Sequence, residues 1–206
     1  MTDEEGHWMS IADLMSALMM VFIVISVGFL HQLKNNGNVY KQKLNAALHD
    51  EFNHDLETWK AYITDDNIIR FRAPFDSGSA QLSNTYQVIL NEFFPRYIKL
   101  LTSKEFKHNI ETLRIEGHTS SEWAEGSTDK ERYINNMRLS QSRASNVLEF
   151  VYKQNQFSID KNRSWLEERL RANGMAFSTP VYLKNESIKD NVNSRRVEFR
   201  VVTKAK

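Results

Sequence analysis

The chain has 206 residues, and its 27 basic and 26 acidic side chains give a formal net charge of +1. This balance provides no basic surface of the kind that binds nucleic acid. It contains no cysteine, which excludes disulfides, thiol catalysis and cysteine-ligated metal sites and is compatible with either the cytoplasm or the periplasm. Among its 7 glycines there is no Walker-type, dinucleotide-binding or G-x-S-x-G pattern, and nothing indicates an enzyme.

The most informative stretch is the near-continuous apolar run at residues 8–30, WMSIADLMSALMMVFIVISVGFL. Its segment 11–30 would form about 30 Å of helix, enough to cross the hydrocarbon core of a bilayer. A lone carboxylate such as Asp13 costs roughly 2.5–3.5 kcal/mol in a spanning helix, so it usually has a function there. The alternative is that Asp13 simply reaches the headgroups. We predict a transmembrane helix over 11–30, preceded by a short cytoplasmic segment at 1–10.

The flanks of the apolar run argue against a cleaved signal peptide. Residues 3–5 are acidic rather than basic, and no small-residue cleavage site follows the run. We therefore expect a retained, single-pass anchor. Lys34, Lys41 and Lys43 follow the helix, and by the positive-inside rule alone they would place the C-terminal part in the cytoplasm.

A polar break with Gly37 is expected at residues 31–38, followed by an amphipathic helix of about 20 residues that extends to Trp59. The apolar positions of this helix recur every four residues, at Tyr40, Leu44, Leu48, Phe52 and Leu56. The apolar stripe could pack on the C-terminal domain or on a second copy of itself. Residues 31–64 are thus predicted to be a linker helix.

The remaining residues, 65–206, alternate between strand and helix patterns. Strands are predicted at 68–71, 110–116 and 196–202, and helices at 85–101, interrupted or kinked near Pro95, at 136–154 and at 165–172, where Asn173 and Gly174 would form the C-cap. The predicted fold class is therefore α/β, an α+β sandwich with a β-α-β-α-(α)-β order.

Within the apolar run, ADLMSALMMVF closely resembles the transmembrane motif of MotB-type stator subunits. The resemblance implies that Asp13 carries the coupling ion, a proton or a sodium ion, and it implies no other cofactor. Small residues on the same helical face, Ser16 and Ala17, would let partner helices approach closely.

Four ordered motifs in the C-terminal part resemble an OmpA-like peptidoglycan-binding domain over about residues 68–203. They are FDSGSAQLS at 75–83, IEGHTS at 115–120, NNMRLSQSRASNV at 135–147 and NSRRVEFRV at 193–201. Four motifs in the family's order are far more specific than any one of them alone. The resemblance implies a β-α-β-α-β domain that binds the cell wall.

In that family, an Asp of a GHTD motif and an Arg hold the zwitterionic end of a diaminopimelate side chain. Arg143 matches the Arg, and Asn136 and Leu139 match positions that line the same groove. The Asp is replaced by Ser120, which accepts a hydrogen bond but supplies no charge. Either Glu122 takes its role, or the ligand is held differently, or the domain has become a scaffold or dimerisation module.

Three further basic residues lie in these motifs. Of Arg195 and Arg196, one is expected to face the site and the other to be a solvated strand residue. His118 is interpreted as a structural member of the GHT turn. Because the other histidines are scattered, we predict no metal site.

The combined resemblance implies the B subunit of an ion-driven motor, in which a homodimer sits inside a pentameric MotA/ZorA-like membrane subunit. The acidic N-terminal segment and GHTSSEW are more similar to the ZorB family of Zorya anti-phage defence systems than to flagellar stators. This implies a bacterial inner-membrane protein with its C-terminal domain in the periplasm, against the lysine signal. The alternatives are a flagellar MotB-like stator, a passive wall-anchoring membrane protein and an ExbD-like energy transducer.

Overall fold

The computed structural model describes residues 3–72, 74–183 and 187–204, while the side chains of residues 3–10 and 33–36 lie outside this description. The acidic side chains at residues 3–5 and the side chain of Lys34, which entered the predictions of a retained anchor and its orientation, therefore lie outside the described part of the chain as well. The chain divides into a first unit that ends at Gln42 and a second unit that extends from Lys43 to Lys204.

Helix α1 runs without interruption from Asp3 to Phe52. Among the described residues it is the one helix whose length and composition suit a membrane span, with a mean hydropathy of 2.3 in its most apolar window. The polar break predicted at 31–38 is wrong, because the helix continues through Gly37. A single glycine costs a helix interior only about 1 kcal/mol, which the helical segments on both sides outweigh.

The end of α1 belongs to the second unit. Leu44, Leu48 and Phe52 are fully buried there, so the apolar stripe packs within its own chain, which was one of the two alternatives. The helix ends at Phe52 rather than near Trp59, and residues 53–60 form turns. A short strand, β1 (Ala61–Ile63), follows within the segment 31–64 that was predicted to be entirely linker helix.

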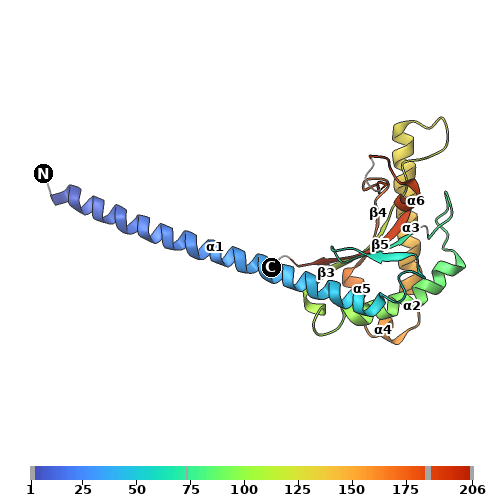
Figure 1. Cartoon of the computed structure of the whole chain (residues 1–206), viewed down its shortest axis with the longest axis horizontal. Helices are drawn as coiled ribbons and strands as arrows, with labels where there is room; N and C mark the ends of the chain where they lie inside the picture. The colour runs from blue at the N-terminus through green and yellow to red at the C-terminus, as the bar shows by residue number, and fades with distance from the viewer. Residues whose placement is uncertain (1–2, 73, 184–186, 205–206) are drawn as a thin grey trace. The chain divides into compact units, whose positions relative to one another are not determined.

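A five-stranded mixed sheet forms the centre of the second unit (Figure 1). Its spatial order is β1-β2-β5-β3-β4, in which only the β3–β4 pair is parallel. The remaining strands are β2 (Ile68–Arg72), β3 (Ile110–Gly117), β4 (Leu170–Gly174) and β5 (Arg196–Thr203). This confirms the predicted α/β class and places the ends of β3 and the start of β5 side by side.

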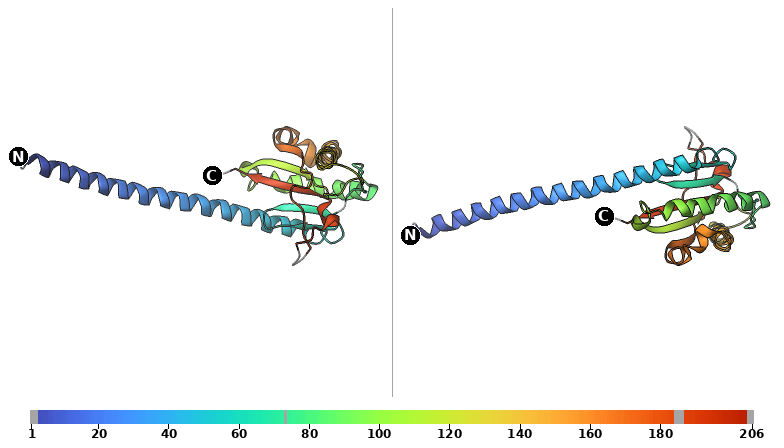
Figure 2. Two further views of the ribbon diagram at one scale, coloured as in Figure 1. Left: turned by 90° about the horizontal axis from the view of Figure 1, so that it is seen from above. Right: turned by 90° about the horizontal axis from the view of Figure 1, so that it is seen from below.

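The two faces of this sheet differ in chemistry, because successive side chains of a strand point to opposite faces. One face is aromatic and aliphatic: Phe93 of α2 (Asn84–Leu101) packs with ring centroids 5.0 Å from both Phe71 and Phe199. The other face carries the charged neighbours Arg70 and Glu198. Figure 2 shows the helices and strands of the second unit from above and from below.

Besides α2, the second unit contains the long helix α3 (Asp129–Tyr152). Its short helical elements are η1 (Lys107–Asn109), α4 (Phe157–Asp160), α5 (Arg163–Arg169) and α6 (Asn191–Ser194). Helix α2 passes through Pro95 without the predicted interruption. Helix α3 begins at Asp129, earlier than the predicted 136, because Thr128 and Glu131 form a capping box.

Residues 170–174 form a strand and not the predicted end of a helix, so Asn173 and Gly174 are not a helix C-cap. Parallel pairing with β3 draws this segment into the sheet. Gly174 lies against α3 so closely that a Cβ would meet the backbone nitrogen of Gln141 at 2.6 Å. Tertiary packing therefore overrides a local preference here.

Candidate functional site

A pocket of about 360 Å³ lies where the chain leaves β3, between the start of α3 and the segment after β2. It brings together all five residues predicted for the C-terminal domain: Ser120, Glu122, Asn136, Leu139 and Arg143. The remaining lining residues are Ser77, Gly78, Thr119, Trp123, Ala124 and Arg195. The pocket is thus built from four segments that are far apart in the sequence.

Helix α3 supplies three of these side chains from one face, since Asn136, Leu139 and Arg143 follow a spacing of three and four residues. Its position is fixed by a close approach to β3: a Cβ on Gly117 would lie 2.2 Å from the carbonyl oxygen of Ser140. Asn136 is buried and donates to the backbone oxygen of Glu122 at 3.3 Å, which ties the loop after β3 to the helix.

Arg143 is the central charge of the pocket, although only 2% of its surface is exposed. Its Nε donates to the carbonyl oxygen of Ser79 at 2.8 Å, and its Nη2 donates to that of Asp76 at 3.0 Å. The guanidinium also lies over the ring of Phe75, 5.1 Å from the ring centroid. Burial, together with the nearby charge of Arg195, lowers the pKa of Arg143 to about 10, so it is charged at neutral pH.

Glu122 lies at the same pocket but is already engaged. Its Oε1 accepts a hydrogen bond from Asn191 at 2.7 Å, and its Oε2 lies 3.8 Å from Nη1 of Arg195. Ser120 is buried and stands at the position where the related motif has an aspartate. Arg195 is therefore the arginine that faces the site, as one of the two expectations had it.

Arg196 is not the solvated strand residue that was expected. It is buried, and its Nε donates to Oε1 of Glu198 at 2.6 Å. Glu198 also accepts from Arg70, and Arg200 bridges Glu198 and Glu116. This network occupies the charged face of the sheet, where burial of charge is tolerated because every carboxylate has a cationic partner.

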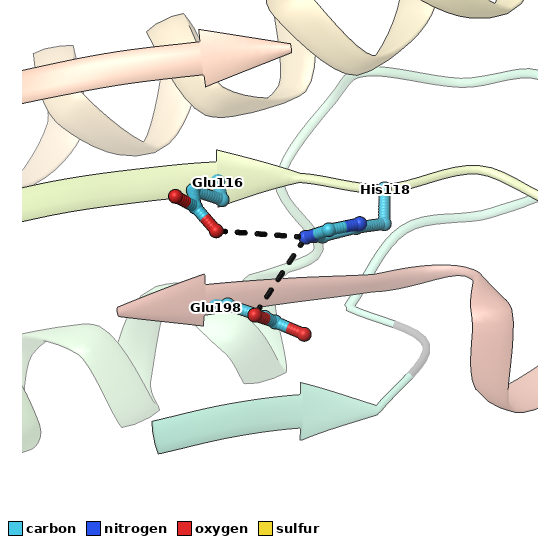
Figure 3. A group of neighbouring side chains, drawn as sticks. All are labelled: Glu116, His118 and Glu198. Carbon is cyan, nitrogen blue, oxygen red and sulfur yellow. Dashed lines mark ion pairs between the residues drawn. The ribbon is translucent and has the colours of Figure 1, made fainter. Parts of the chain in front are cut away.

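The structure places His118 in the turn after β3, as expected, and its backbone N–H donates a hydrogen bond to the carbonyl oxygen of Arg196. Figure 3 shows its ring between Glu116 and Glu198, with Nε2 at 4.0 and 3.8 Å from their carboxylate oxygens. Burial, and then the charge of Arg196, lowers the pKa of His118 to about 3. The imidazole is therefore neutral at physiological pH.

Glu116, His118 and Glu198 offer ligand atoms within 4.8 Å of one another, a grouping that could hold a metal ion. The sequence did not reveal it, because the two glutamates lie on different strands. However, Arg70, Arg196 and Arg200 already supply the positive charge that a cation would bring. The chemistry of this donor set therefore fits a structural ion-pair network better than a metal centre.

Asp13, the remaining predicted site residue, lies in α1 with its side chain exposed. The helix that carries it places Ser16 and Ala17 on the same face, three and four residues further on. The first unit therefore offers one carboxylate beside small residues.

Comparison with known proteins agrees with these observations. A model of the OmpA family matches residues 74–194, more than half of the chain. Zorya protein ZorB from Escherichia coli (strain Crooks) is 36% identical over 216 aligned residues, covering 98% of this chain and 90% of ZorB. The chain belongs to the ZorB family. Its C-terminal domain belongs to the OmpA family. The matched residues, 74–194, include every residue of the pocket except Arg195.

Solved structures resemble this ZorB-family chain to different degrees. The cell wall anchor of the type VI secretion system (T6SS) from Pseudomonas aeruginosa has a TM-score of 0.50 at 20% identity, covering 76% of this chain and 97% of that one. A putative MotB-like protein from Desulfovibrio vulgaris has a TM-score of 0.47 at 18% identity, covering 84% of this chain and 94% of that one. The likeness to the cell wall anchor concerns the fold alone.

Proposed function

We propose that this ZorB-family chain is the B subunit of an ion-driven inner-membrane motor of a Zorya anti-phage system, anchored to peptidoglycan through the Arg143 pocket. The observation that carries the anchoring role is the pocket itself. Four of the predicted residues, Ser120, Glu122, Asn136 and Leu139, line one pocket together with the buried guanidinium of Arg143. A guanidinium binds a carboxylate with directed, charge-assisted hydrogen bonds, and carboxylates are abundant in peptidoglycan stem peptides.

The motor role is proposed for the first unit. The single apolar helix would cross the inner membrane once, with the second unit in the periplasm. Asp13 would take up and release the coupling ion, a proton or a sodium ion, against a pentameric ZorA-like subunit around a dimer of this chain. Family membership in ZorB supports this assignment over a flagellar stator.

In this mechanism the two units have separate tasks. The carboxylate of Asp13 changes charge as the ion passes, and the change in electrostatic energy moves one subunit against the other. The Arg143 pocket holds the chain to the wall, so that the movement has a fixed reference. Helix α1 connects these tasks, because it contains Asp13 and ends among buried residues of the second unit.

The anchoring role is tested by co-sedimentation of the full-length, detergent-solubilised protein with purified sacculi. Arg143→Gln should lower the apparent affinity at least about tenfold, because it removes a charged hydrogen-bond donor from a buried site. Arg138→Gln is the matched control, since Arg138 lies on the same helix, is exposed and does not line the pocket. This control should bind like the unchanged protein.

Arg143 also holds the carbonyl groups of Asp76 and Ser79, so Arg143→Gln could alter the loop as well as the ligand contacts. Leu139→Glu leaves those contacts in place and adds a negative charge to the pocket wall. It should also weaken sacculus binding. Binding that survives both substitutions would contradict the anchoring role.

A further inference from the structure

The charges of the pocket do not balance. Its ionisable lining residues are Arg143, Arg195 and Glu122, which give two positive charges and one negative charge. Oε2 of Glu122 lies 3.8 Å from Nη1 of Arg195, and Oε1 accepts a hydrogen bond from Asn191. The charge of Glu122 is therefore balanced by Arg195. Among the described residues, no carboxylate lies within ion-pair distance of Arg143. The uncompensated charge of the pocket is therefore positive and belongs to Arg143.

The pocket also has unused hydrogen-bond donors. A guanidinium has five N–H groups, and the hydrogen bonds to Ser79 and Asp76 use two of those on Arg143. The hydroxyl of Thr119 lines the pocket, is buried, and has no hydrogen-bond partner among the described residues. A buried hydroxyl without a partner costs about 1–3 kcal/mol, which a bound ligand would recover. Ser120 adds a second buried hydroxyl at the same wall.

A positive charge beside unpaired hydrogen-bond donors favours the binding of an anion. The pocket has no unpaired carboxylate, among its described lining residues, that would hold an ammonium group. We propose that the pocket recognises a carboxylate of the peptidoglycan stem peptide by itself and does not require the neighbouring ammonium group of a zwitterionic side chain. This inference rests on the proposed anchoring function and specifies its ligand. Ser120 defines the specificity, because it contributes a hydrogen bond where a zwitterion-binding site needs a negative charge.

The test compares three preparations of the same sacculi in the co-sedimentation assay with full-length protein. One is untreated, one has its free amines acetylated, and one has its free carboxyl groups amidated. Each affinity is measured relative to Arg143→Gln, which reports non-specific attraction to the wall. We expect acetylated sacculi to bind within twofold of untreated sacculi. We expect amidated sacculi to bind at least tenfold more weakly.

Two variants sharpen the comparison. Ser120→Asp adds a carboxylate to the pocket that contains Arg143, so this variant should bind untreated sacculi at least fivefold better than acetylated ones. Thr119→Val removes the unpartnered hydroxyl while keeping the shape of the side chain. It should weaken binding to untreated sacculi severalfold without lowering the melting temperature, because the hydroxyl has no partner to lose within the described residues.

The outcomes separate the two hypotheses. If untreated sacculi are not bound, the anchoring function fails and the inference fails with it. If untreated sacculi are bound but acetylation abolishes binding, anchoring stands and the carboxylate-only recognition is wrong. Binding that survives amidation would likewise overturn the inference alone.

Discussion

Two buried charges of the second unit, on Glu198 and Arg143, lie in contrasting environments. Glu198 is enclosed by Arg70, Arg196 and Arg200, and although burial by itself would raise its pKa, the surrounding basic side chains hold the pKa below its ordinary value. Arg143 has only backbone carbonyls as hydrogen-bond partners among the described residues. A buried charge is costly without an opposite charge, so Glu198 is fully compensated within the chain, whereas Arg143 has no opposite charge beside it among the described residues.

His118 makes the stability of the second unit depend on pH. Its pKa is about 3 in the folded chain, against an ordinary value near 6.5, so only the unfolded chain takes up this proton between those values. The stability that depends on the neutral imidazole of His118 is therefore fully present above about pH 6.5, and it is lost progressively as the pH falls toward 3. The expected loss is roughly 1.5 kcal/mol between pH 6.5 and pH 5.

Thermal unfolding of the full-length protein, followed by tryptophan fluorescence over this pH range, measures the effect. His118→Gln replaces the imidazole with a group that does not titrate, so the melting temperature should vary less with pH than in the unchanged protein. His108→Gln serves as the control, because His108 shows no buried environment in η1. An unchanged pH dependence in His118→Gln would show that the neutral imidazole is not the cause.

At the scale of single residues, the sequence predicted which residues line the pocket but missed the buried ion-pair network around Glu116 and Glu198. Arg143, Asn136 and Ser120 line one pocket and were identified from the family resemblance, which gives their order along the chain; their binding role stays a prediction. Glu116 and Glu198 meet only through the antiparallel pairing of β3 and β5, and no local pattern shows that pairing. The alternation of charged residues in RRVEFR was the one available signal, since it places Arg196, Glu198 and Arg200 on the same face.

At the scale of elements, α1 changes its environment along its length. Val39 is half exposed, whereas Leu44 and Leu48, five and nine residues later, are completely buried within the second unit. Phe52 continues the contact, with its ring centroid 5.3 Å from that of Phe93. Arg96 of α2 adds ion pairs to this junction at Glu51 and Asp55.

Truncating a side chain in this part of α1 should destabilise the whole second unit. Leu48→Ala removes a fully buried side chain and leaves a cavity, which should lower the free energy of unfolding by about 2–5 kcal/mol. Val39→Ala, in the same helix but half exposed, should change it by less than about 0.5 kcal/mol. Equal melting temperatures for the two variants would mean that the end of α1 does not contribute to the core.

Two of the elements that were missed, β1 and β4, share a physical cause. The four-residue spacing of apolar residues correctly predicted helix up to Phe52, but the spacing continues to Leu56 while the chain turns. Strand β1 has only three residues, too few for an alternating pattern, and its place is fixed by pairing with β2. Strand β4 likewise exists because β3 lies beside it. Local patterns therefore failed where long-range pairing decides the structure.

At the scale of the whole molecule, one chain joins a carboxylate in an apolar helix to a cationic pocket in an OmpA-family domain. A passive wall anchor needs the pocket and a membrane helix, but it has no use for an acidic side chain among apolar residues. A motor subunit needs both. The two proposed roles can therefore be separated by mutation, with ion carrying tested at Asp13 and anchoring tested at Arg143.

Asp13→Asn preserves the shape of the side chain and removes its titratable charge. In cells that carry this gene with its genetic neighbours, we expect Asp13→Asn to abolish protection against phage, measured as plating efficiency, at unchanged membrane levels. The same variant should bind sacculi normally, because it leaves the pocket intact. Arg143→Gln should lose both sacculus binding and protection. Protection retained by Asp13→Asn would make Asp13 structural and would leave the passive anchor as the better description, since only the motor mechanism requires a carboxylate that changes its charge.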